Sequence, residues 1–288
     1  MIPKRIYLCG GGVNVIAHVG VLKELEERKY LSAVREWIGV SAGALMALCL
    51  VIGYTLEEIE HFYLKFDFTN LIDIDSAPGW ILNYGLDTGQ KLRKLIEACL
   101  HVKGLSDEIT FKELCELRGN SYRVFVTDLH DAELIEFSDR KTPDRKVVDA
   151  VTASMSLPYY FQPVVDCDSG HFLIDGGTIS NYPLYRLTPS ELSETLGIYL
   201  RTMPPQKKEL DLQDLAFRPV QILLSMRAKF EMRQYMSQTI NVELGHRNSI
   251  NFEIGEDEKR EMMRLGREAT LAFFRSRATH IQRRYSVS

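Results

Sequence analysis

The chain alternates short apolar runs with longer segments that are apolar on one face only. The first apolar run, Ile6–Cys9, ends in three glycines, and Ile16–Arg28 then places apolar residues on one helical face and charged residues on the other. This pattern predicts a strand, a glycine turn and an amphipathic helix. A second buried strand at 37–40 and a helix at 42–51 are predicted next.

The alternation continues to the end of the chain. Further helices are predicted at 55–66 (opened by the capping-box pattern Thr55-Leu56-Glu57-Glu58), 89–100, 110–114, 147–154, 217–239 and 256–274. Further strands are predicted at 122–128, 133–138, 172–174, 196–200 and 250–254, and a loop or flap at 71–85. This order predicts an α/β fold, a three-layer α/β/α sandwich with a mainly parallel central sheet. No linker composition divides the chain, so we expect one domain over residues 1–288.

Composition narrows the class of protein. Apolar residues make up 45% and charged residues 26%, which is ordinary globular usage. Lys plus Arg number 35 against 39 Asp plus Glu, so no nucleic-acid partner is expected. Five cysteines without C-x-x-C spacing indicate neither a disulfide framework nor a zinc site. The first apolar run is too short for a signal core. We expect a protein that is cytoplasmic or peripheral at a membrane surface, not secreted.

Trp37–Tyr54 is an uncharged run of 18 residues, the lower limit for a membrane span. The run contains Gly39, Ser41, Gly43 and Gly53, and its first part has the pattern of a buried strand. A strand followed by a core helix has the same hydropathy as a span. We therefore interpret the run as strand and helix.

Gly10-Gly11-Gly12 first suggests a nucleotide site. The dinucleotide fingerprint G-x-G-x-x-G fails because position 15 is Val15 and the second strand does not end in an acid. A Walker A loop fails because no Gly-Lys-Ser/Thr follows. Consecutive glycines before a helix direct several amides at one point, which suits an anion or an oxyanion. A tight turn without a ligand is the alternative, and a lone glycine triplet favours it.

Gly39-Val40-Ser41-Ala42-Gly43 matches G-x-S-x-G, a strand-to-helix elbow that exposes a serine nucleophile. The apolar strand before it and the apolar helix after it are the context that the motif requires. Glycines on both sides relieve crowding around the strained residue. We therefore interpret Ser41 as a nucleophile rather than a packing serine.

A serine nucleophile needs a base. His246 lies in a polar loop and His280 on an Arg-rich tail, so both are interpreted as surface residues. Ile174-Asp175-Gly176-Gly177 instead puts a carboxylate at the end of an apolar strand, where parallel α/β sheets build their sites. A carboxylate with a pKa near 4 needs desolvation and direct contact to serve as the base. Taken alone, the segment is equally typical of an ordinary turn.

Together the three motifs resemble the patatin-like phospholipase family, whose pattern is a Gly-rich oxyanion loop, then G-x-S-x-G, then a later D-G-G/A. The resemblance covers about residues 5–200, so that 201–288 would complete the domain with C-terminal helices and a strand. Similar stretches are 17–22, 153–158, 161–163 and Asn181-Tyr182-Pro183. The order and spacing of three motifs make the resemblance far more specific than any one of them.

The resemblance implies a catalytic dyad of Ser41 and Asp175 without histidine. Asp175 would accept the Ser41 proton, and the serine would attack a lipid or fatty-acyl ester to give an acyl-enzyme. It implies an oxyanion hole formed by Gly10, Gly11, Gly12 and Val13, with Asn14, Gly39, Gly43, Gly176 and Gly177 as supporting residues. No metal-ligand spacing is visible, so we expect neither a metal nor a cofactor.

The glycine loop departs from the family pattern at two positions. After the three glycines the family has any residue, then Arg or Lys, then Gly, whereas this chain has Val13, Asn14 and Val15. Losing the cation weakens the positive field, and Val15 cannot take the positive φ that glycine allows. Asn14 could donate from its amide. Three functions stay open: a lipid acyl hydrolase of phospholipase A or lysophospholipase type, a lipid- or partner-binding protein without turnover, and an acyltransferase.

A lipid substrate implies transient contact with a membrane surface. The predicted helix 217–239 mixes basic residues with large apolar ones, a composition that docks on anionic lipid. Such a helix more often covers a sheet with its charged side in water. The segment 275–284 would add positive charge, although a solvated tail is the more usual role. The oligomeric state stays open.

Overall fold

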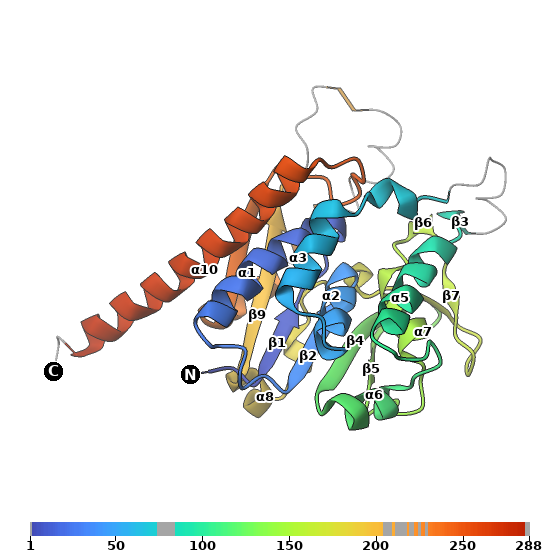
Figure 1. The fold of residues 1–288 in the computed structure, drawn as a ribbon, viewed down its shortest axis with the longest axis horizontal. Helices are drawn as coiled ribbons and strands as arrows, with labels where there is room; N and C mark the ends of the chain where they lie inside the picture. The colour runs from blue at the N-terminus through green and yellow to red at the C-terminus, as the bar shows by residue number, and fades with distance from the viewer. Residues whose placement is uncertain are drawn as a thin grey trace.

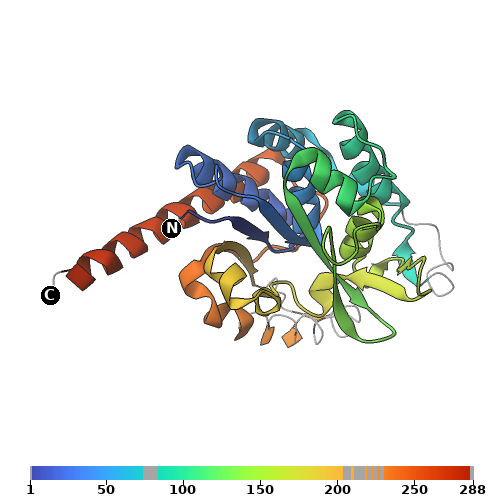
Figure 2. The same cartoon turned by 90° about the horizontal axis from the view of Figure 1, so that it is seen from below.

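The computed structural model describes residues 2–73, 84–203 and 230–285, with residues 209, 210, 218, 222, 223, 226 and 227 between the last two ranges. Side chains are described as far as residue 277. An eight-stranded sheet lies between helices (Figures 1 and 2). Its strands are β1 (Arg5–Leu8), β2 (Glu36–Val40), β4 (Ser121–Asp128), β5 (Glu133–Ser138), β7 (Val164–Val165), β8 (Phe172–Asp175), β9 (Thr195–Thr202) and β10 (Thr239–Gly245).

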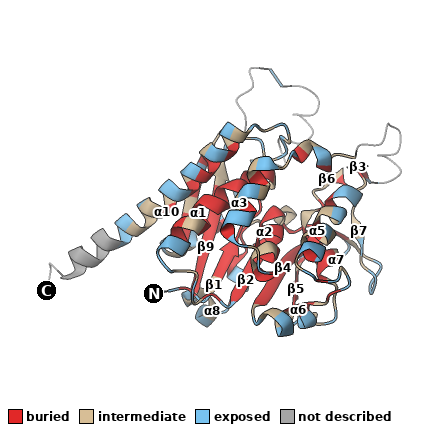
Figure 3. Ribbon diagram, in the orientation of Figure 1, coloured by how far each residue is buried: buried red, intermediate tan, exposed pale blue. Residues whose placement is uncertain are grey.

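The helices form a layer on each face of the sheet. One face carries α1 (Ile16–Glu27), α2 (Ala42–Val51), α3 (Leu56–Lys65), α5 (Gln90–Val102), α7 (Val147–Met155) and the long α10 (Glu256–Tyr285), while α6 (Phe111–Arg118) packs near β4 and β5. Figure 2 shows α8 (Pro189–Ser193) and the helical residues 231–234 on the other face. The strands between the layers are largely buried (Figure 3). This is the predicted three-layer α/β/α arrangement.

The sheet is mixed, with the strand order β10-β9-β1-β2-β4-β8-β7. The five strands from β10 to β4 are parallel, as the alternation of strands and helices predicts. Beyond β4 the pairs turn antiparallel, since β5 and β8 both run against β4 and β7 runs against β8. β4 therefore lies between β2, which leads to Ser41, and β8, which ends at Asp175.

The uncharged run 37–54 is a strand and a helix, as interpreted. It forms β2, buried at every residue, and α2, which packs against β2. No helix within the described part of the chain is long and apolar enough to cross a bilayer. The Thr55 capping box also forms: Thr55 Oγ1 accepts from Glu58 N, and Glu58 accepts from Thr55 N.

Two predictions in the C-terminal part were wrong. The strand predicted at 250–254 is irregular backbone, and Ile250 N instead donates to Asn248 Oδ1 in a local turn. The strand lies earlier, at β10, where Thr239 was expected to end a helix. Thr239–Leu244 alternates apolar and polar residues with the two-residue period of a strand, and the helix before it ends at residue 234. The start of the predicted helix 217–239 lies largely outside the described residues.

The predicted flap 71–85 falls mostly on residues 74–83, which lie outside the described residues. Its last residue opens a strand that the sequence analysis missed, β3 (Gly85–Asp87), which pairs with β6 (Tyr159–Phe161). This two-stranded sheet lies at the upper edge of the molecule in Figure 1.

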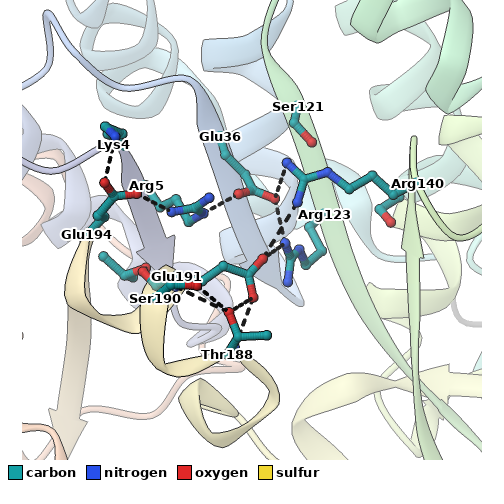
Figure 4. A network of polar contacts seen from close by, with 12 residues as sticks. Lys4, Arg5, Glu36, Ser121, Arg123, Arg140, Thr188, Ser190, Glu191 and Glu194 are labelled. Atoms are coloured by element: carbon teal, nitrogen blue, oxygen red, sulfur yellow. Dashed lines mark hydrogen bonds and ion pairs between the residues drawn. The ribbon is translucent and has the colours of Figure 1, made fainter.

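A network of ion pairs lies at the end of the eight-stranded sheet where β1 and β2 begin, opposite the end that carries Ser41 (Figure 4). Arg123 donates to Glu36 at 2.6 Å and to Glu191 at 2.8 Å, and Arg5 also bonds Glu36. The side chains of Arg123 and Glu36 are almost fully buried. These charges satisfy one another inside the fold and lie away from the edge that carries Ser41.

Candidate active site

Ser41 lies on a strained turn between β2 and α2. Its φ of 55° and ψ of −136° are unusual for a residue with a side chain. The flanking glycines are required by space, because a Cβ on Gly43 would lie 2.4 Å from the Cys9 carbonyl oxygen, and one on Gly39 would lie 2.5 Å from Ala44 Cα. Ser41 keeps part of its surface exposed. This is the elbow geometry expected for an accessible nucleophile.

Ser154, a residue that the sequence analysis did not single out, holds this elbow in place. Its Oγ accepts a hydrogen bond from Ser41 N at 2.9 Å and donates one to the Phe125 carbonyl oxygen at 2.7 Å. Ser154 is completely buried. It therefore ties the backbone of Ser41 to β4. Its place in the stretch 153–158 was the one available signal.

Asp175 ends β8, where the antiparallel ladder sets it opposite Val126 of β4. Val40, the residue before Ser41, lies opposite Phe125 on the other side of β4. The two predicted dyad residues therefore flank neighbouring positions of one strand. Asp175 is only 4% exposed, and its Oδ1 accepts from Gly177 N at 2.7 Å.

Burial raises the pKa of Asp175 to about 6, and hydrogen bonds from the Ser41 hydroxyl and the Gly177 amide limit the rise. Desolvation disfavours the charged carboxylate, which makes it a stronger base than an exposed aspartate. The Ser41 hydroxyl is the group that lies against this base. The predicted pair is thus brought together.

Gly10 begins the glycine loop directly beside Ser41. A Cβ on Gly10 would lie 2.7 Å from both Ser41 Cβ and Asn181 Oδ1. Asn181 bonds both main-chain groups of Gly10: its Oδ1 accepts from Gly10 N at 2.9 Å, and its Nδ2 donates to Gly10 O at 3.1 Å. The loop is therefore held beside Ser41 by Asn181, a residue for which the sequence predicted no role.

The backbone hydrogen bonds of the loop correct the predicted set of oxyanion donors. Gly10 N is bonded to Asn181, and Val13 N donates to the Ser249 carbonyl oxygen at 3.0 Å. Gly11 N and Gly12 N have no acceptor among the described residues, and both glycines are partly exposed. The available donors are thus Gly11 and Gly12, without Gly10 and Val13.

The two departures from the family pattern differ in consequence. Val15 has a φ of −59°, so its position requires no glycine and the expected strain is absent. The positive φ of the loop falls on Gly12, at 53°. Asn14 is 2% exposed, and its Nδ2 has no partner among the residues that the structure describes. Asn14 is therefore enclosed beside the loop.

Three of the described histidines, His18, His130 and His171, are held by hydrogen bonds away from Ser41. His18 is buried and bonds the Cys9 carbonyl oxygen through Nε2 at 2.9 Å, and burial lowers its pKa to about 4. His171 and His130 meet Asp128 in a cluster whose spacing the sequence does not reveal. His171 Nδ1 bonds Asp128 at 2.8 Å, and the two rings stack with centroids 4.5 Å apart. His130 Nδ1 also accepts a hydrogen bond from Phe172 N at 3.1 Å, so the cluster joins the end of β4 to the start of β8.

The fold recurs in solved structures of bacterial proteins. VipD from Legionella pneumophila matches with a TM-score of 0.66 at 18% sequence identity, over 96% of this chain and 67% of that one. ExoU of Pseudomonas aeruginosa, a type III effector protein, matches with a TM-score of 0.56 at 17% identity, over 96% of this chain and 53% of that one. At these identities the likeness shows the shared fold.

Sequence comparison adds the family. The model of the patatin-like phospholipase family matches residues 6–188, and the chain belongs to this family. The uncharacterized protein YqhO of Bacillus subtilis is 27% identical over 92% of this chain and 96% of its own length. The probable lipid hydrolase 463L of Invertebrate iridescent virus 6 is 30% identical over 63% of this chain, which spans 62% of that protein. Family membership supports lipid hydrolysis as the general activity.

Proposed function

We propose that the protein is a serine acyl hydrolase of phospholipase A or lysophospholipase type that uses a Ser41–Asp175 dyad. The observation that carries the proposal is the Ser41 hydroxyl against a buried carboxylate whose pKa is raised to about 6. A base with a pKa near the working pH combines the correct protonation state with sufficient basicity. The Gly10–Gly12 loop lies directly beside the same serine.

In the proposed reaction Asp175 accepts the proton of Ser41 as Oγ attacks the carbonyl carbon of a lipid ester. The amides of Gly11 and Gly12 donate to the oxyanion of the tetrahedral intermediate, and one such donor is worth about 2.7 to 4 kcal/mol of barrier. Asp175 returns the proton to the leaving alcohol, which leaves an acyl ester on Ser41. Water then gives one proton to Asp175 and attacks this ester, and Asp175 passes that proton to Ser41 Oγ as the fatty acid leaves.

Exposed apolar side chains around the site support transient docking on a lipid surface. Tyr84, Leu86 and Tyr159 lie on or beside the two-stranded sheet of β3 and β6, and all are exposed. This sheet is close to the acid, because Ser156, three residues before Tyr159, accepts a hydrogen bond from Asp175 N through its carbonyl. Apolar and aromatic side chains near an active site can enter the headgroup region of a bilayer.

The decisive experiment compares wild type with Ser41→Ala on a fluorogenic acyl ester and on phospholipid vesicles. We expect Ser41→Ala to reduce both rates to background, because the nucleophile is lost, while the exposed Ser193→Ala leaves them unchanged. A fluorophosphonate should label the wild type at Ser41 only. Equal rates for wild type and Ser41→Ala would refute the proposal that the protein hydrolyses esters through Ser41. Vesicle binding without Ser41-dependent turnover would identify a binding protein, and product gained on adding an acceptor alcohol would identify an acyltransferase.

Docking is tested separately with Leu86→Asp. A charge at this exposed position of β3 should lower the rate of hydrolysis of vesicle phospholipid several-fold and leave the rate on a water-soluble ester unchanged. Only the vesicle substrate requires contact with a lipid surface. Leu117→Asp is the matched control, since Leu117 is exposed on α6, which lies at the lower edge of Figure 1, away from β3 and β6. Equal loss on both substrates would argue for damage to the site instead of lost docking.

A further inference from the structure

Asn181 connects the acid's segment to the glycine loop across most of the chain. It lies six residues after Asp175, yet its side chain bonds both main-chain groups of Gly10. A carboxamide is suited to this contact because it carries an acceptor and a donor side by side. Aspartate would keep the acceptor only, and an aliphatic side chain would keep neither.

The backbone around Asn181 is anchored on both sides, so the carboxamide is held before any ligand arrives. Ser180 N donates to the Gly176 carbonyl oxygen at 3.0 Å, and Ser180 Oγ donates to the buried Glu231 at 2.7 Å. The ring of Tyr182 is completely buried and its hydroxyl lies 2.7 Å from Thr239 Oγ1. These contacts, to the turn after β8, to the helical residues 231–234 and to β10, hold the backbone around Asn181.

The bond to the Gly10 carbonyl also determines where the next amide points. A trans peptide is planar, so its C=O and the following N–H point in opposite directions. Asn181 Nδ2 holds Gly10 O, which forces Gly11 N–H to face away from Asn181. The next plane is held in the same way, because Gly11 O accepts from Asn14 N at 3.0 Å and so orients Gly12 N–H. Both available donors are therefore pre-oriented through the carbonyl at the other side of their peptide.

We propose that Asn181 is a positioning residue that orients the Gly11 amide for the oxyanion by holding the Gly10 carbonyl. The inference rests on the proposed function for its catalytic consequence. Asn181 also lies close to the acid, since a Cβ on Gly177 would lie 3.0 Å from Asp175 Oδ1 and 3.4 Å from Asn181 Oδ1. Asn181 thus holds the loop beside Ser41 and lies near the acid.

The test compares Asn181→Ala, Asn181→Asp and the exposed control Asn70→Ala. Pre-oriented donors act on the transition state, so Asn181→Ala should lower kcat about 10- to 100-fold with KM within about threefold of wild type. Affinity for a trifluoromethyl ketone lipid analogue, which forms a tetrahedral adduct, should fall with kcat. Asn181→Asp should also lower kcat. It should shift the acid limb of the pH–rate profile to higher pH, because its negative charge opposes ionisation of Asp175. Unchanged kcat, or a rise in KM alone, would overturn the proposal.

A readout without turnover separates this proposal from the proposed function. In ¹⁵N-labelled protein, amide hydrogen exchange at Gly10 should accelerate at least tenfold in Asn181→Ala and stay unchanged in Asn70→Ala. Exchange at Gly10 that is as slow in Asn181→Ala as in wild type would refute the proposal that Asn181 holds Gly10, whatever the activity. Faster exchange in Asn181→Ala, together with no Ser41-dependent turnover in wild type, would support the role of Asn181 in holding Gly10 and refute the proposed hydrolase function.

Discussion

Replacing Asp175 with asparagine should abolish activity and yet stabilise the fold at alkaline pH. Burial raises the pKa of Asp175 from 3.8 to about 6, because the charged carboxylate loses its hydration. A shift of roughly two units corresponds to about 3 kcal/mol of free energy. Asparagine has nearly the same shape and carries no charge, and its Oδ1 can accept the bond from Gly177 N.

The sign of the pH dependence follows from linkage. A carboxyl whose folded pKa lies above its unfolded value binds its proton more tightly in the folded state. The free energy of unfolding of the wild type therefore falls as pH rises from about 4 to about 6, and stays lower above that. Asp175→Asn lacks this loss, so its advantage should reach up to about 3 kcal/mol at pH 8 and vanish near pH 4.

The assay is urea unfolding of wild type, Asp175→Asn and the exposed control Asp144→Asn at pH 8 and pH 4. The control should show no such difference between the two pH values. In parallel, wild-type kcat/KM should rise with pH and reach half its plateau near pH 6, as the base loses its proton. The reasoning would be refuted by an Asp175→Asn variant less stable than wild type at pH 8, or by a rate independent of pH between 5 and 8.

Two further substitutions test the loop and the distant ion-pair network. Gly12→Ala should destabilise the protein by at least 1 kcal/mol more than Gly104→Ala in urea unfolding: both have positive φ, but only at Gly12 would a Cβ lie 2.0 Å from a carbonyl oxygen, that of Ser249. Equal costs would contradict this. Glu191→Gln should cost about 1.5 to 3 kcal/mol at pH 7. Hydrogen bonds from Arg123 and Thr188 outweigh burial and lower the pKa of Glu191 to about 2, so its stabilisation is complete above its unfolded pKa near 4.5 and is lost as pH falls toward 2. A difference from wild type that persists unchanged at pH 2.5 would refute it.

The sequence could predict the parts of the site that local geometry dictates. A serine between two glycines at a strand end, and a glycine triplet before a helix, fix the backbone within a few residues, so both turns could be located from the sequence. Asp175 came from the same kind of signal. Ser154 and Asn181 gave no such signal, because their bonds reach residues 113 and 171 positions away.

The errors have the same origin. Whether Gly10 and Val13 have free amides depends on Asn181 and on the Ser249 carbonyl, which the fold brings to the loop from the far end of the chain. Apolar residues at 250–254 resemble a strand, yet the alternation that fills the edge beside β9 is the one at Thr239–Leu244. The antiparallel direction of β8 is likewise determined by its pairing with β4, and a four-residue strand has no sequence pattern that would predict it.

Because β8 runs against β4, the alignment of the acid with the nucleophile depends on how two strands are matched. Sliding β8 by a single position would replace Asp175 with Ile174 or Gly176 opposite Val126, and would turn the carboxylate to the other side of the sheet. The connection between α5 and α6, residues 103–110, is free of that demand, since its length does not change how β8 is matched with β4. Relatives can therefore lengthen or shorten this connection at little cost to chemistry, whereas one inserted residue within β4 or β8 would separate acid from alcohol.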